Sequence, residues 1–340
     1  DCSKLHTYKY NEDLFKKVNV IPEGKNHGLV FILDWSGSMC DCMVDTIKQL
    51  YNLVWFCSKV NIPFDVYAFT NSYKSRSDTY IPRSEGEKGE FYIPDDFSLM
   101  NFLTSKVNKK TLETQMRNLY RIAYEVKHYV SYRTPYQTSL SGTPLNEALV
   151  SLHTILPQFK KENQLQKVQV VVLTDGEAHQ LYHWGYYNDY TTGDQKLSPR
   201  TLGYDGYLRN RKTGYTYKID YEYWKFTEVL LRDLKQSFPD INFIGIRLCI
   251  PREFTSIVRR FEYLTDSDMK KTRKDKSYNV VEKSGYQSLF IMLQNSLSSD
   301  TSFDVNEGES KIKIKSAFIK SLKAKTLNKK VLSQFMDLVC

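Results

Sequence analysis

Four nearly continuous apolar runs dominate the hydrophobic pattern of this 340-residue chain. They are GLVFILD (28–34), FDVYAFT (64–70), VQVVVLTD (168–175) and INFIGIRL (241–248). Each is rich in Val, Ile or Phe and shows little alternation of apolar and polar positions. Such runs are typical of β-strands that helices cover on both faces. The pattern therefore predicts four buried, parallel strands.

Between these runs, apolar residues recur every three or four positions, as on one face of an amphipathic helix. Helices are expected after Ser38, after Thr143 with Pro144 at the first helical position, and over 223–238 and 251–264. Strands that alternate with helices predict the α/β class, with a doubly wound, mostly parallel sheet.

The end of this alternation is expected to be a strand at YNVVE (278–282), followed by a helix over 286–297. Residues 71–108 do not fit the alternation, and neither does a Tyr-rich insertion at 180–223. Inside that insertion, GYLRNRKTGYTYKI predicts a β-hairpin with a turn over Asn210–Gly214.

The domain plan that follows has three parts: an N-terminal segment (1–27), a main domain (28–298) with the Tyr-rich insertion, and a basic helical tail (299–340). The formal net charge of +9 comes in large part from that tail. A basic tail suits an acidic partner, either protein or nucleic acid, or is simply a solvated helix face.

Cysteine content and hydropathy indicate the compartment. Six cysteines in 340 residues do not suggest a disulfide framework. No apolar stretch approaches the length needed to cross a bilayer. We therefore expect a cytoplasmic protein that does not contact a membrane.

Hard oxygen ligands gather where the expected strands end. Asp34 ends the first run and precedes Ser36 and Ser38, Thr143 lies just before a helix, and Asp175 ends the third run. The carboxyl ends of parallel strands share one edge of a sheet, so these side chains should lie together. Carboxylate and hydroxyl oxygens suit Mg²⁺, with Mn²⁺ or Ca²⁺ as alternatives. Two carboxylates balance a divalent cation and leave an exchangeable position, which an acidic residue of a partner protein could take.

Each of these residues also has a simpler interpretation. Asp34 could merely end a strand, Ser38 and Thr143 could cap helices, and Asp175 with Gly176 could form a turn. The metal hypothesis depends on all of the oxygen ligands occurring together at three strand–helix junctions.

A second, soft-metal site is a further hypothesis. His179 and His183 have the i, i+4 spacing that can bind Zn²⁺ from one helix face, and Cys40 and Cys42 follow the Asp34 loop on the same expected edge. A metal-dependent hydrolase that uses this edge with the two histidines is therefore one alternative function. The chain has neither a G-x-S-x-G elbow nor a P-loop, which argues against other hydrolases and phosphoryl-transfer enzymes.

The aromatic insertion offers a third function, binding of single-stranded nucleic acid, because aromatic rings stack on bases and basic groups contact phosphates. The simpler interpretation is a set of packed cross-strand pairs. The basic residues concerned are Arg209, Arg211, Lys212 and Lys218.

The strings DWSGS, SGTP and LTDGE resemble the three loops of the metal-ion-dependent adhesion site (MIDAS) of von Willebrand factor A (vWA) domains. The pattern of that family is D-x-S-x-S, then Thr, then Asp, and all five positions are filled. The resemblance covers roughly residues 28–295. It implies that Ser36, Ser38 and Thr143 coordinate Mg²⁺ directly, and that Asp34 and Asp175 act largely through water.

KNHGLVFILDWSGSM and the preceding KYNEDLFKK resemble the C-terminal region of the cobaltochelatase T subunit (CobT type), in particular the versions carried by tailed phages. In such chelatases the vWA subunit works beside an AAA+ ATPase (MoxR or CobS type) and does not perform the chemistry. The resemblance implies a non-catalytic subunit, a link to cobalamin biosynthesis, and the cytoplasm of a bacterial host. The Tyr-rich insertion and the basic tail depart from the pattern.

Overall fold

The computed structural model describes residues 26–59, 61–71, 86–128, 138–189, 193–202, 206–219 and 225–294, together with Pro135 and Thr191. Almost all of the expected N-terminal segment and all of the expected basic tail therefore lie outside the described residues.

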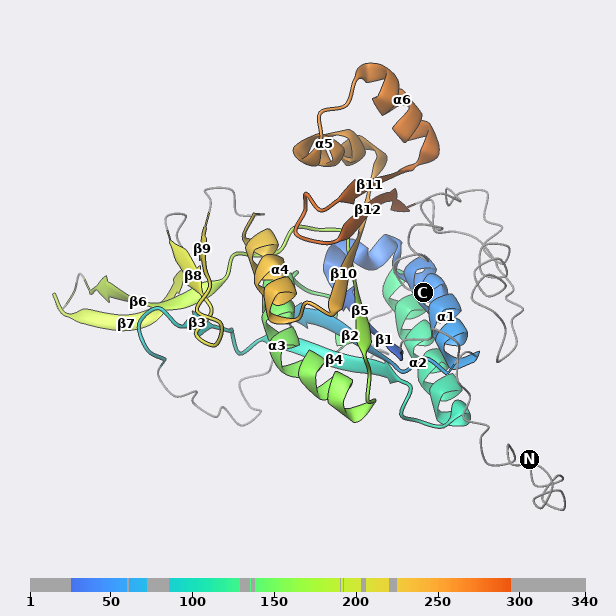
Figure 1. Cartoon of the computed structure of the whole chain (residues 1–340), viewed down its shortest axis with the longest axis horizontal. Coiled ribbons are helices and arrows are strands. Elements are labelled where there is room, and N and C mark those ends of the chain that lie inside the picture. The colour runs from blue at the N-terminus through green and yellow to red at the C-terminus, as the bar shows by residue number, and fades with distance from the viewer. Residues whose placement is uncertain are drawn as a thin grey trace, which may run out of the picture.

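A seven-stranded sheet forms the centre of the molecule (Figure 1). Its spatial order is β11 (Ser277–Val281), β12 (Ser288–Leu293), β10 (Ile241–Cys249), β5 (Lys167–Thr174), β1 (His27–Asp34), β2 (Phe64–Asn71) and β4 (Phe97–Thr104). The five central strands are parallel, and the edge strands β11 and β4 are antiparallel to their neighbours. The four strands predicted from apolar runs are confirmed to within one residue at each end.

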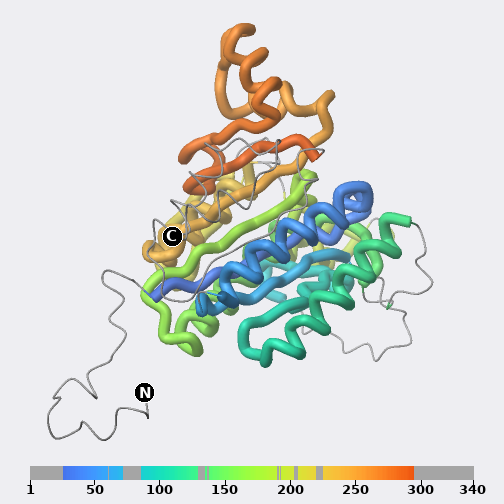
Figure 2. Tube along the Cα trace, turned by 90° about the vertical axis from the view of Figure 1, so that its right-hand side faces the viewer, coloured from blue at the N-terminus to red at the C-terminus, as the bar shows by residue number. Residues whose placement is uncertain are grey.

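Helices cover both faces of this sheet. On one face lie α1 (Met43–Lys59) and α2 (Lys109–Lys127), side by side in Figure 2. On the other lie α3 (Leu145–Glu162), α4 (Lys225–Ser237) and α5 (Pro251–Phe261), with α6 (Asp266–Asp275) next to α5. These two layers confirm the α/β class with a mostly parallel sheet.

The central strand β1 shows how the sequence builds the two layers. Its buried side chains alternate: Leu29, Phe31 and Leu33 pack toward α1 and α2, whereas Val30 and Ile32 pack toward α3. Both faces are apolar because both are covered, which is why the run is continuous.

The expected helix over 286–297 is wrong. Residues 288–293 form β12, which pairs in parallel with β10, and all six of its residues are buried. A short, wholly buried apolar run has no periodicity that separates a strand from a helix. Two smaller differences from the sequence predictions remain. Pro144 is the N-cap of α3, whereas it was expected at the first helical position. Residues 71–108, which were expected to lie outside the strand–helix alternation, contain the edge strand β4.

The Tyr-rich insertion forms two small antiparallel sheets beside the main one. β6 (Tyr182–Asn188) and β7 (Gln195–Thr201) pair with each other, β6 also pairs with β3 (Phe91–Tyr92), and the two long strands extend away from the main sheet in Figure 1. β8 (Tyr207–Arg209) and β9 (Thr216–Lys218) form the predicted hairpin. Its turn runs over Asn210–Gly214, where Gly214 has a φ of 78° that favours glycine.

Among the helices of the described residues, none is long and apolar enough to cross a membrane.

Candidate functional site

Three loops meet at the carboxyl edge of the sheet. β1 ends at Asp34 and β5 ends at Thr174, and these strands are neighbours although β2 and β4 lie between them in the chain. After β1 the chain first adds β2 and β4 on one side of it, and later adds β5 on its other side. Such a switch point is where ligands bind in open α/β sheets.

The first loop runs from Asp34 through the short 3₁₀ helix η2 (Gly37–Asp41) into α1. The Ser36 N–H donates to Asp34 Oδ1 at 3.0 Å. The Gly37 N–H donates to the Ser141 carbonyl at 2.8 Å, and Ser36 and Ser141 form a parallel β-bridge. The second loop is therefore held directly against the first.

Trp35 holds the first loop in place through the core that lies under α1 and α2. Its ring is fully buried, and its Nε1–H donates to the Thr138 carbonyl at 2.7 Å. It also packs edge-on against Phe102, with ring centroids 4.9 Å apart. Alternation places Asp34 on the opposite side from Trp35, so burial of the indole fixes the direction of the carboxylate.

The five predicted oxygen ligands are brought together. Ser36 Oγ lies 3.1 Å from Ser38 Oγ, and Ser38 Oγ donates to Asp175 Oδ1 at 2.8 Å. Thr143 Oγ1 lies 3.7 Å from the position that a Cβ on Gly176 would take. The residues come from three different loops, as the sequence predicted.

Thr174 is a member of the site that sequence reasoning missed. Its hydroxyl donates to Asp34 Oδ2 at 2.6 Å and accepts from the Gly176 N–H at 3.1 Å. It thereby links the ends of β1 and β5. The only sequence signal was a hydroxyl residue in the last position of a buried strand, immediately before Asp175.

Burial dominates the electrostatics of the site. Asp34 is 1% exposed, and burial raises its pKa to about 7. Hydrogen bonds from Thr174 and Ser36 oppose that rise, and the negative charge of Asp175 adds to it. The pKa of Asp175 is also raised by burial, against the hydrogen bond from Ser38 and the positive charge of Arg247. A buried carboxylate close to a partly buried one favours the binding of a proton or a cation.

The expected soft-metal cluster is wrong. The described part of the chain contains no group of three or more His, Cys, Asp or Glu side chains that could hold a metal ion. Burial raises the pKa of Cys42 to about 12, which keeps its thiol protonated, and Cys40 Sγ donates to the Val126 carbonyl at 3.4 Å. His179 lies in a loop beside Gly142, and His183 lies on β6 in a different sheet, so the two histidines do not share a helix face.

The basic residues of the insertion are partly neutralised. Arg211 pairs with Glu90 at 3.0 Å, while the neighbouring rings of Tyr207 and Tyr215 are exposed. Binding of single-stranded nucleic acid at this hairpin stays a prediction.

No family model matches the chain, and no curated protein matches it. Solved structures with a similar arrangement include the pilus adhesin SpaC from Lactobacillus rhamnosus GG (13% identity, TM-score 0.36, 66% of this chain and 25% of that one). A second is proximal thread matrix protein 1 from the mussel byssus (11% identity, TM-score 0.32, 68% of this chain and 41% of that one). A third is a mutant of the PilB minor pilin from Streptococcus sanguinis (11% identity, TM-score 0.33, 94% of this chain and 65% of that one). The chain spans less than two thirds of the length of each. Likeness at these identities and TM-scores carries no argument about function.

Proposed function

We propose that the chain is a Mg²⁺-dependent protein-binding module that uses a metal-ion-dependent adhesion site of the vWA type. One observation supports this proposal: three loops bring Asp34, Ser36, Ser38, Thr143 and Asp175 close together at the switch point of the sheet. The donor set is all oxygen, which fits Mg²⁺ and does not fit a thiophilic metal.

The charges of the site support the same metal. Asp34 is buried and Asp175 is partly buried, and this raises both pKa values; a bound cation would favour their charged forms and so be balanced by two carboxylates. The Ser and Thr hydroxyls add neutral oxygens, so a divalent cation would be balanced without a third carboxylate. A bound Mg²⁺ would present an electrophilic position to an acidic side chain of a partner protein.

Positioning by the chain itself supports a preformed site. The Ser36–Ser141 bridge fixes the distance between the first two loops, and Thr174 fixes Asp34 relative to the third. Little rearrangement would then be needed when the metal binds, and a preorganised site loses less free energy to ordering.

The partner class comes from the sequence resemblance to CobT-type subunits. We propose that the chain is a non-catalytic, cobaltochelatase-like subunit and that its partner is an AAA+ ATPase of the MoxR or CobS type. An acidic residue of that ATPase would complete the metal shell. For the hydrolase alternative, His179 lies beside the oxygen ligands, where its backbone N–H donates to the Thr143 carbonyl at 3.2 Å, but His183 lies on β6 in a separate sheet, so the two histidines do not act there as a pair.

The metal half of the proposal is tested by titrating Mg²⁺ into the full chain and following its melting temperature. Ligands that bind only the folded state raise that temperature by mass action. We expect a saturable rise in the wild type that is lost in Thr143→Val and in Asp175→Asn. Ser141→Ala is the matched control, because it removes a hydroxyl from the second loop and leaves the backbone bridge in place. A rise that survives in both site variants would contradict the proposal.

The partner half is tested with a purified MoxR- or CobS-type AAA+ ATPase. We expect complex formation in Mg²⁺, dissociation on addition of EDTA, and weak binding by Thr143→Val. Binding that ignores EDTA and the Thr143 substitution would show that the metal edge is not the contact surface. Salt-resistant retention on single-stranded RNA by the same variant would instead favour a nucleic-acid binder.

A further inference from the structure

A second group of polar side chains lies one strand away from the end of β1, where β2 ends. Asn71 is the last residue of β2, and Asp96 lies just before the neighbouring strand β4. The Asn71 Nδ2–H donates to Asp96 Oδ2 at 3.1 Å. This bond uses the amide nitrogen, so the amide oxygen of Asn71 remains as an acceptor.

Glu147 reaches the same place from α3. Asn71 faces α3, because it lies on the same side of β2 as Phe69, which packs in that layer. The loop before α3 lies against it, since a Cβ on Gly142 would be 3.1 Å from Asn71 Oδ1. Glu147 belongs to the first turn of α3 and is 3% exposed. Burial raises the pKa of Glu147 to about 7, and the negative charge of Asp96 adds to that rise, so the two carboxylates are close enough to interact.

Three buried acceptor atoms of this group have no hydrogen-bond partner among the described residues. They are Asn71 Oδ1, Asp96 Oδ1 and Glu147 Oε2. A buried acceptor without a partner costs free energy, and native proteins contain few of them. Three such atoms from three different elements therefore mark a place where a ligand or water completes the bonding.

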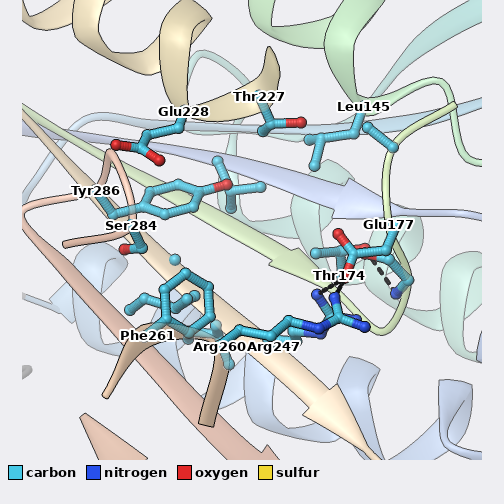
Figure 3. Close-up of a pocket in the computed structure, with 16 residues that line it drawn as sticks. Leu145, Thr174, Glu177, Thr227, Glu228, Arg247, Arg260, Phe261, Ser284 and Tyr286 are labelled. Atoms are coloured by element: carbon cyan, nitrogen blue, oxygen red, sulfur yellow. Dashed lines mark hydrogen bonds and ion pairs between the residues drawn. The ribbon is translucent and has the colours of Figure 1, made fainter. Parts of the chain in front are cut away.

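The other side of the metal edge shows how the chain neutralises a carboxylate with its own cations. There Glu177 lies against the guanidinium groups of Arg247 and Arg260 (Figure 3). Within the described ranges, no basic side chain pairs with Asp96 or Glu147 in this way. The two negative charges near β2 thus call for a positive charge from outside this part of the chain.

We propose that Asn71, Asp96 and Glu147 form a second cation site, and that its ligand is Ca²⁺. Water alone would satisfy the three acceptors but would leave two like charges close together, whereas a divalent cation also balances them. Carboxylate and Asn carbonyl oxygens are typical ligands of Ca²⁺, and water would complete its shell of about six to eight oxygens. Mg²⁺ demands near-ideal octahedral geometry, whereas Ca²⁺ tolerates an irregular set of oxygens such as this one.

The test counts bound radioactive Ca²⁺ by equilibrium dialysis of the full chain that carries both Thr143→Val and Asp175→Asn. These substitutions disable the proposed Mg²⁺ site, so the result is independent of the function proposed above. We expect saturable binding of about one Ca²⁺ per chain in this background. Failure of the Mg²⁺ titration would leave this expectation unchanged.

Two further substitutions locate the site. Glu147→Gln and Asp96→Asn, each added to the same background, should weaken Ca²⁺ binding at least about tenfold, because each removes a charged ligand. Glu162→Gln is the matched control, because Glu162 is a carboxylate at the other end of α3 and pairs with Lys106. All variants are first compared by thermal unfolding in metal-free buffer to establish that they fold.

Three results would overturn the inference. The first is the absence of bound Ca²⁺ at up to about 10 mM, well above the dissociation constants of weak protein Ca²⁺ sites; water alone would then complete the bonding. The second is binding that Glu147→Gln and Asp96→Asn leave unchanged. The third is binding that Glu162→Gln reduces as much as Glu147→Gln does.

Discussion

Asp34→Asn should stabilise the metal-free protein at neutral pH while abolishing its response to Mg²⁺. Asp34 is buried, and its carboxylate interacts with neutral donors: the Ser36 N–H and the Thr174 hydroxyl. An Asn side chain has nearly the same shape and can keep the bond from Ser36. It differs mainly in never carrying the buried charge.

The magnitude follows from the pKa. Burial raises the pKa of Asp34 from 3.8 to about 7. The folded state then binds a proton more tightly than the unfolded state, so the wild type loses stability as pH rises from 3.8 through 7. At about 1.4 kcal/mol per pKa unit, the full cost above pH 7 is about 4 kcal/mol. Below about pH 4 both states are protonated, and the cost disappears.

The assay is urea unfolding of wild type and Asp34→Asn between pH 4 and pH 8, with and without Mg²⁺. Without metal, the free energy of unfolding of the variant should exceed that of the wild type by an amount that grows with pH, up to about 4 kcal/mol at pH 8. With Mg²⁺ at about a hundred times its dissociation constant, the wild type should gain about 2.7 kcal/mol and the variant nothing. Asp41→Asn is the matched control, because Asp41 is exposed at the end of η2.

Two outcomes would refute this reasoning. If Asp34→Asn is no more stable than the wild type at pH 8 without metal, the carboxylate is not a buried, costly charge. If Mg²⁺ stabilises both proteins equally, the metal binds elsewhere.

Three further substitutions test the framework around the site, each by urea unfolding. Trp35→Ala should cost about 3–5 kcal/mol, since it empties a fully buried site; a cost under about 1 kcal/mol would mean that the indole does not anchor the loop. Gly28→Ala should cost about 1–3 kcal/mol, because the new Cβ would lie 2.3 Å from Leu165 Cδ1; an unchanged midpoint would show that the contact relaxes freely. Glu177→Gln should cost about 2 kcal/mol, because it removes the negative charge that pairs with Arg247 and Arg260; this is less than the cost of breaking a fully buried ion pair. A more stable variant would refute the role of the ion pair.

The sequence alone determined four of the five central strands, and it predicted that the five oxygen-bearing side chains lie close together. The strands were predictable because long, continuous apolar runs persist only where both faces of a strand are covered. The proximity of these side chains was predictable because Asp34 and Asp175 directly end such runs, and parallel strands end on a shared edge. The apolar runs are a local signal, and the shared edge follows from the general rule that the carboxyl ends of neighbouring parallel strands lie together.

Prediction failed where local sequence admits two structures. β12 was expected to be helical. Its sequence SLFIML is apolar at almost every position because the strand is buried on both faces, and such a short apolar run does not separate a strand from a helix. The edge strand β4 was not expected, because most of its residues are only partly buried and give a weak apolar signal. The soft-metal cluster failed because His183 follows Asp175 closely in sequence but enters a separate sheet.

Only the tertiary structure showed the further long-range contacts around this edge. Thr174 bonds to Asp34 across 140 positions, and Glu177 reaches Arg247 and Arg260 across 70 and 83. These meetings follow from the order β10-β5-β1 in the sheet and from the packing of α5 over it. Strand order results from the balance of long-range packing and loop closure over the whole chain, so no local pattern of residues carries it.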